Sequence, residues 1–129
     1  MAWSGDIFLA NQSGYPEVKF VVPTEGVMFW HDNMMIPVGA ADPLDAITYM
    51  NYAYRPDVAA KMADFIWYVT PVPSAKDIVL NQLKDPTVGN SPLVFPTTED
   101  LASVHPYKVF KSPEEEDKWN SVWQPVYSS

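Results

Sequence analysis

The sequence predicts an α/β protein that is helix-rich after residue 40. Two apolar runs, residues 18–22 and 27–36, have the β-branched and bulky composition of strands. After residue 40, apolar residues recur at helical spacing and several stretches open on a proline, which favours a helix first turn. With 129 residues, 47% hydrophobic and 14% aromatic, the chain is too apolar to be disordered.

The strands are expected in the first third of the chain. Residues 1–4 have the composition of a strand end, and a turn leads from them into a short helix over residues 7–11. Residues 18–22 should form a strand, and residues 27–36 a second strand that is apolar on both faces, as in sheets covered on both sides. Two or three strands make a marginal sheet unless further strands come from elsewhere.

Two helices should follow one another between residues 42 and 65. Asp42 and Pro43 give the first helix an acidic cap and a proline in its first turn. One face of this helix is expected to consist of Leu44, Ile47, Met50 (or Asn51) and Tyr54. The second helix, over residues 57–65, is expected to point Val58, Met62 and Phe65 inward.

A proline-bounded turn at residues 67–71 is expected to present aromatic rings. A helix over residues 75–84 follows, and an irregular connection over residues 85–96 comes after it. The apolar side of the 75–84 helix consists of Ile78, Val79 and Leu83.

Two capped helices are expected at the end of the chain. Thr97 or Thr98 could cap a short helix over residues 98–102. Ser112 caps the last helix, whose first turn is acidic and which should stop near Pro125. The residues that this helix is expected to bury are Trp119, Val122 and Trp123.

Charge and composition narrow the class of function. Sixteen acidic residues against eight basic ones give a net charge of −8, which disfavours binding to nucleic-acid phosphates. Solubility is the ordinary explanation of such a charge, and affinity for cations is the alternative. The absence of cysteine excludes disulfides and thiolate chemistry. No stretch has the apolar length of a membrane span, and MAWSGDIFLANQ lacks the basic region of a signal peptide.

Trp30 and Asp32 are the first candidates for a binding site. Two residues apart in a strand, they would share a face at a distance of about 7 Å. An aromatic ring beside a carboxylate suits an alkylammonium ion, because cation–π contact contributes about 0.5–2 kcal/mol and a charge-assisted hydrogen bond about 1.5–3 kcal/mol. Taken alone, the two residues favour a structural role, in which Asp32 caps a turn or pairs with a lysine.

Two further stretches combine aromatic and polar side chains. Trp3 and Asp6 lie at an expected strand end, where ligands of α/β sheets usually bind, although Asp6 is equally suited to cap a helix. Trp67 and Tyr68 lie in the aromatic turn, where packing onto the core is the structural alternative.

No pattern indicates an enzyme. In a strand, His31 points away from Asp32, so a His–Asp catalytic pair is geometrically poor. His31 and His105 lack metal-binding spacing, and the chain has no GxSxG serine and no nucleotide-binding glycine pattern. The sequence therefore predicts no catalysis, no metal and no cofactor. A hydrolase that uses His31 or His105 is kept as an alternative hypothesis.

Several motifs are similar to one family: MAWSGD, VVPTEG, FW-x-D-N-M-x-I-P, NYAYRPDVAAK and W-Y-x-T-P. Together, from residue 1 to about residue 80, the chain resembles the C-terminal third of bacterial spermidine/putrescine-binding proteins, the solute receptors of polyamine ABC importers. The resemblance implies a fragment of a type II periplasmic-binding-protein fold, in which crossing strands join two lobes and the polyamine binds between them.

The resemblance also implies the site residues. Trp3, Trp30 and Tyr68 match aromatic residues of the family's cleft, and Asp6 and Asp32 match carboxylates that bind ligand amines. This reverses the structural interpretation of Trp30 and Asp32, because a ligand ammonium would be the partner of the acid. Half a cleft is expected to bind weakly or not at all.

By the family's topology, residues 1–30 and 77–129 belong to the second lobe and residues 31–76 to the first. Such a fragment would either exchange elements with a second copy or persist as a compact remnant. The resemblance implies an ABC permease as partner and a periplasmic or lipid-anchored extracytoplasmic location. The alternatives are a receptor for another small solute and a truncated remnant that oligomerises without a ligand.

Overall fold

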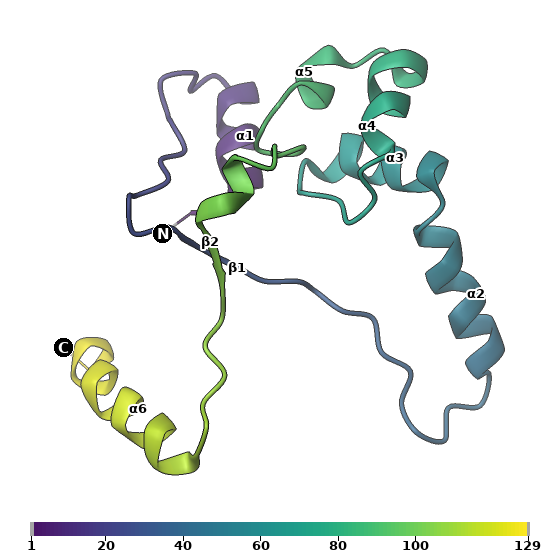
Figure 1. Cartoon of the computed structure of the whole chain (residues 1–129). Helices are drawn as coiled ribbons and strands as arrows, with labels where there is room; N and C mark the ends of the chain where they lie inside the picture. The colour runs from purple at the N-terminus through teal and green to yellow at the C-terminus, as the bar shows by residue number, and fades with distance from the viewer. Residues whose placement is uncertain (1, 129) are drawn as a thin grey trace.

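The computed structural model describes residues 2–128 and shows several helices around one small sheet (Figure 1). The predicted richness in helices after residue 40 is confirmed. In chain order the elements are α1 (Ser4–Gln12), β1 (Val27–Phe29), α2 (Pro43–Ala53), α3 (Pro56–Ile66), α4 (Ala75–Ile78), the π-helix η1 (Val79–Leu83), α5 (Pro86–Gly89), the 3₁₀-helix η2 (Asp100–Ser103), β2 (Val104–Pro106) and α6 (Pro113–Tyr127).

The sheet has two parallel strands of three residues each. Val27 is opposite Val104 and Phe29 is opposite Pro106. The predicted strand over residues 27–36 is therefore wrong beyond residue 29, and residues 18–22 form no strand. A strand forms only where a partner offers its backbone groups, and within residues 2–128 the one partner of β1 is β2. Nothing in the sequence analysis predicted β2.

Helix α1 begins three residues before the predicted start. The carboxylate of Asp6 accepts a hydrogen bond from the backbone N–H of Trp3 at 3.1 Å, which stabilises the first turn. The predicted strand end at residues 1–4 is wrong for its described part, because residues 2 and 3 are irregular and Ser4 is helical. Phe8 is the buried large side chain of this helix.

Helices α2 and α3 form where the sequence predicted them, and both begin on a proline. The buried face of α3 is different from the predicted one: Met62 is half-exposed and Phe65 is 83% exposed. The residues that α3 buries are Ala59, Ala60 and Ala63, whose small side chains allow α4 and η1 to approach closely. No residue of α2 is buried, and Asp42 makes no side-chain capping hydrogen bond.

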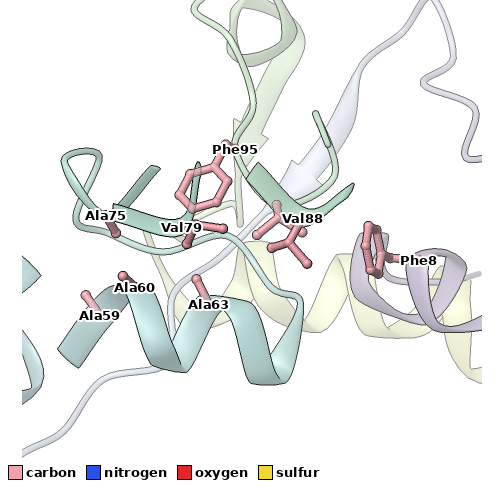
Figure 2. Packing of buried hydrophobic residues seen from close by; sticks show 9 residues of the cluster. Phe8, Ala59, Ala60, Ala63, Ala75, Val79, Val88 and Phe95 are labelled. Carbon is pink, nitrogen blue, oxygen red and sulfur yellow. The ribbon is translucent and has the colours of Figure 1, made fainter. Parts of the chain in front are cut away.

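The core lies where α3 packs against the stretch that contains α4, η1 and α5 (Figure 2). The predicted helix over residues 75–84 is confirmed, although its second half is a π-helix, and its Val79 is fully buried. The connection over residues 85–96 is more than an irregular loop, because it forms α5 and contributes core side chains. The buried core residues are Phe8, Ala59, Ala60, Ala63, Ala75, Val79, Val88, Val94 and Phe95.

The Ser112 cap is confirmed, because its hydroxyl accepts from the Glu115 N–H at the start of α6. Thr97 exchanges hydrogen bonds with Asp100 as predicted for this region, but the helix predicted over residues 98–102 is the 3₁₀-helix η2, which begins at Asp100 with Glu99 at its N-cap. Helix α6 ends at Tyr127, close to the predicted stop near Pro125, although this proline lies inside the helix. The predicted burial of three α6 side chains is wrong: Trp119, Val122 and Trp123 are all exposed. Within residues 2–128, no helix is both long and apolar enough to span a bilayer.

Candidate functional site

Four of the five predicted site residues are joined by direct contacts. The rings of Trp3 and Trp30 meet edge to face, with centroids 4.2 Å apart and planes inclined at 61°. Asp6 accepts from the Trp3 N–H at 3.1 Å and from the Tyr68 hydroxyl at 3.0 Å. The start of α1, the residue after β1 and the turn after α3 thus meet, although up to 65 positions separate Trp3 from Tyr68 in the sequence.

Tyr68 reaches this cluster because of two local features. Trp67 ends α3 in a left-handed conformation, with φ of 59°, and its ring packs against Phe8 at a centroid distance of 5.2 Å. Tyr68 then lies over Gly5, where a Cβ atom would be only 2.4 Å from the Tyr68 ring. The predicted structural alternative, in which the rings of this turn pack onto the core, therefore holds for Trp67. Tyr68 instead belongs to the candidate site.

The electrostatics of the cluster leave the charge of Asp6 without a cationic partner. Partial burial raises the pKa of Tyr68, and so do its hydrogen bond to Asp6 and the charge of that carboxylate. Tyr68 is therefore a neutral donor at neutral pH, as is the Trp3 N–H. The two ion pairs of the described chain are Arg55–Asp57 and Lys108–Glu115, and neither involves Asp6.

Asp32 forms no hydrogen bond or ion pair with the other four residues. Its side chain is exposed and forms no hydrogen bond or ion pair with any residue between 2 and 128. Because β1 ends at Phe29, no strand spans Trp30 and Asp32, and their position on one face about 7 Å apart stays a prediction. The structural alternative, an ion pair with a lysine, is absent from the described residues as well.

Tyr107 is the member of the cluster that sequence analysis missed. Its ring centroid is 6.2 Å from that of Trp30. The register of the two parallel strands explains this contact. Phe29 is opposite Pro106, and Trp30 and Tyr107 are the residues that directly follow them. A three-residue strand that ends in proline gives too weak a sequence signal to predict such a pairing.

The arrangement combines ring faces and negative charge. Trp3, Trp30 and Tyr68 are 38%, 36% and 37% exposed, so each ring is anchored within the chain and still has surface for a ligand. Among residues 2–128, no three histidine or acidic side chains are placed to hold a metal ion. His31 contacts the ring of Phe29. This chemistry suits an organic cation with methylene groups.

Comparison with known proteins confirms the resemblance. The family model described as "Bacterial extracellular solute-binding protein" matches residues 1–96, further than the predicted end near residue 80. The spermidine/putrescine-binding periplasmic proteins of Escherichia coli K12 and Salmonella typhimurium are 36% and 34% identical to the chain over 101 and 102 residues, or 78% and 79% of it. No solved structure gives a significant match.

A third relative, the putrescine-binding periplasmic protein PotF of Escherichia coli K12, is 26% identical over 114 residues, or 84% of this chain. All three are named for binding, which agrees with the prediction that the chain is not an enzyme. The chain spans only 27–30% of the length of these relatives.

Proposed function

Because the chain belongs to the family of bacterial extracellular solute-binding proteins, we propose that it is the part of an extracytoplasmic polyamine receptor that binds the ammonium and methylene groups of the ligand. The observation that supports this most directly is the pairing of partly exposed aromatic rings with a carboxylate, Asp6, that has only neutral donors. The names of the relatives support putrescine and spermidine as ligands.

Each site residue then has a defined role. Asp6 and Asp32 bind ammonium groups, and each charge-assisted hydrogen bond contributes about 1.5–3 kcal/mol. Trp3, Trp30 and Tyr68 lie against the methylene chain and the cation, where each ring contributes about 0.5–2 kcal/mol. The Tyr68 hydroxyl also holds the Asp6 carboxylate in place.

The surroundings of this receptor follow from the same proposal. Its partner is the permease of an ABC importer, and its location is the periplasm or the outer face of the cell membrane. Residues 1–30 and 77–129 belong to one lobe and residues 31–76 to the other. Because the chain contains only parts of the two lobes and so only part of the cleft, we expect the chain alone to bind putrescine with a Kd weaker than micromolar.

A chimera tests the proposal. In it, this chain replaces the matched region of the Escherichia coli spermidine/putrescine-binding periplasmic protein. We expect calorimetry to detect putrescine or spermidine binding, and Asp32→Asn to weaken it about tenfold to a hundredfold, the loss of one charge-assisted hydrogen bond. Asp42→Asn is the matched control, because it removes an exposed acid from the same irregular stretch.

Two results would contradict the proposal. One is a folded chimera that binds no polyamine, with folding checked by circular dichroism and thermal melting. The other is equal polyamine affinity for the Asp32→Asn chimera and its parent. Stronger binding of an uncharged solute in the same titrations would favour the alternative of a receptor for another small molecule.

A further inference from the structure

The chain exposes far more surface than a protein of its size that folds alone. Its accessible surface is 10104 Å², whereas a compact monomer of 14.5 kDa exposes about 6,900 Å². The excess of about 3,200 Å² is larger than the roughly 1,000–2,500 Å² that each partner buries in an obligate complex. The excess is therefore as large as an interface with a partner of substantial size.

The sheet indicates that this partner is a polypeptide. Parallel sheets normally have both faces covered and more than two strands, but β1 and β2 pair only with each other within the described residues. Residues 18–22 and 30–36 have the composition of strands and are unpaired. Both outer edges of the pair thus offer backbone groups to additional strands.

Apolar side chains lie uncovered on several helices. Figure 1 shows α2 and α6 projecting away from the packed region at opposite ends of the molecule. On α6, Trp119, Val122 and Trp123 are exposed in one stripe, and on α3, Phe65 is 83% exposed. A shallow groove of about 280 Å³ beside α2 is lined by Met34, Met35, Ile36, Ala46, Tyr49 and Met50.

We infer that these edges and faces are the docking surface for one partner: the portion of a solute-binding protein that corresponds to the part of the relatives outside the 27–30% spanned by this chain. That portion is longer than the chain itself, because the chain spans only 27–30% of the relatives, and it has enough surface to cover the excess. A second copy fits less well, because it would bring together two chains of net charge −8. The identity of the partner rests on the proposed function, whereas the existence of a docking surface does not.

The test mixes the full chain with the complementary part of the Escherichia coli spermidine/putrescine-binding periplasmic protein, from which the matched region has been removed. We expect a 1:1 complex by size-exclusion chromatography with light scattering. Trp123→Glu and Phe65→Glu should each weaken association at least tenfold. Gln124→Glu adds the same charge to α6 beside the stripe and should change the association by less than twofold.

Amide hydrogen exchange gives a second measurement that does not need the separate part to fold. In the covalent chimera described above, amides of residues 18–22 and 30–36 should exchange at least tenfold more slowly than in the chain alone, because added strands accept their hydrogen bonds. Equal exchange in the two proteins would overturn the inference. So would a homodimer of this chain that excludes the complementary part, because the second copy would then be the occupant.

These results separate the inference from the proposed function. A complex, or a chimera with slow exchange, that binds no polyamine would keep the docking surface and reject the receptor function. Polyamine binding by the chain, without association with the complementary part, would keep the receptor function and reject the docking surface.

Discussion

At the scale of single residues, Asp6 is held without being neutralised. A backbone N–H and a phenol fix both carboxylate oxygens, and both donors are uncharged. A lysine or arginine in their place would position the acid equally well but would remove its attraction for a ligand cation. In the proposed receptor, Asp6 would therefore be ordered and would keep its charge for an ammonium group, which is the combination that a preorganised site requires.

The proton of Tyr68 makes the stability of this arrangement depend on pH. Burial and Asp6 raise its pKa above the ordinary value of 10.0, so the folded chain holds the proton more tightly than the unfolded chain does. Its contribution to the free energy of unfolding is complete below pH 10 and is lost as the pH rises through the folded pKa. Urea unfolding of wild type and Tyr68→Phe from pH 7 to 11 measures this.

We expect Tyr68→Phe to lower the free energy of unfolding by about 0.5–1 kcal/mol at pH 7 and by less at pH 11. Tyr15→Phe changes an exposed ring and is the matched control. A constant difference between wild type and Tyr68→Phe over the whole pH range would show that the hydroxyl contributes nothing through its proton.

Gly5 is a second residue with a measurable consequence. Glycine to alanine in a helix ordinarily stabilises by about 0.5–1 kcal/mol, but here the new Cβ would overlap the Tyr68 ring. We therefore expect Gly5→Ala to destabilise the chain by about 1–3 kcal/mol. In the Tyr68→Ala background the same change should become neutral or stabilising, and chemical denaturation of the four proteins completes the cycle.

At the scale of elements, helix starts could be predicted from the sequence and buried faces could not. Prolines and caps act locally, so the starts of α2, α3 and α6 follow from residues such as Pro43, Pro56 and Ser112. The buried face depends on what packs against a helix. The rule that large apolar residues point inward selects Met62 and Phe65, whereas close packing of α3 against α4 uses alanines.

In the strands and in the site too, local features could be predicted from the sequence and long-range pairing could not. Residues 18–22 and 30–36 have strand composition but no partner within the described residues, so local propensity alone overestimates the sheet. Trp3, Asp6, Trp30 and Tyr68 could be predicted together only through the family resemblance. Tyr107 and the position of Asp32 depend on where β1 pairs and ends, which no local pattern records.

Mutations on the two faces of the core helices distinguish the observed packing from the predicted one. We expect Phe65→Ala to change the free energy of unfolding of the isolated chain by no more than about 0.5 kcal/mol, because the ring is exposed. Val79→Ala, in the fully buried core, should cost about 1.5–3 kcal/mol. Chemical denaturation measures both, and a larger loss for Phe65→Ala would mean that the isolated chain buries this ring.

At the scale of the whole molecule, the excess surface predicts a low urea m-value. The unfolded chain exposes about 21,000 Å², so unfolding exposes about 10,900 Å² instead of the roughly 14,100 Å² expected for a compact domain of this mass. Because m scales with the surface exposed on unfolding, we expect about three-quarters of the usual value. A urea titration measures it, and a full-sized m-value would mean that the free chain is compact.

The pairing of β1 with β2 joins Val27 to Val104, 77 positions further along the chain. During synthesis at 5–20 residues per second, the ribosome needs about 4–15 seconds to supply the second strand after it has made the first. Throughout that interval the nascent β1 edge and the neighbouring tryptophan are open to other nascent chains. Export in an unfolded state or a holding chaperone would protect this segment, and slowing translation between the two strands should increase aggregation.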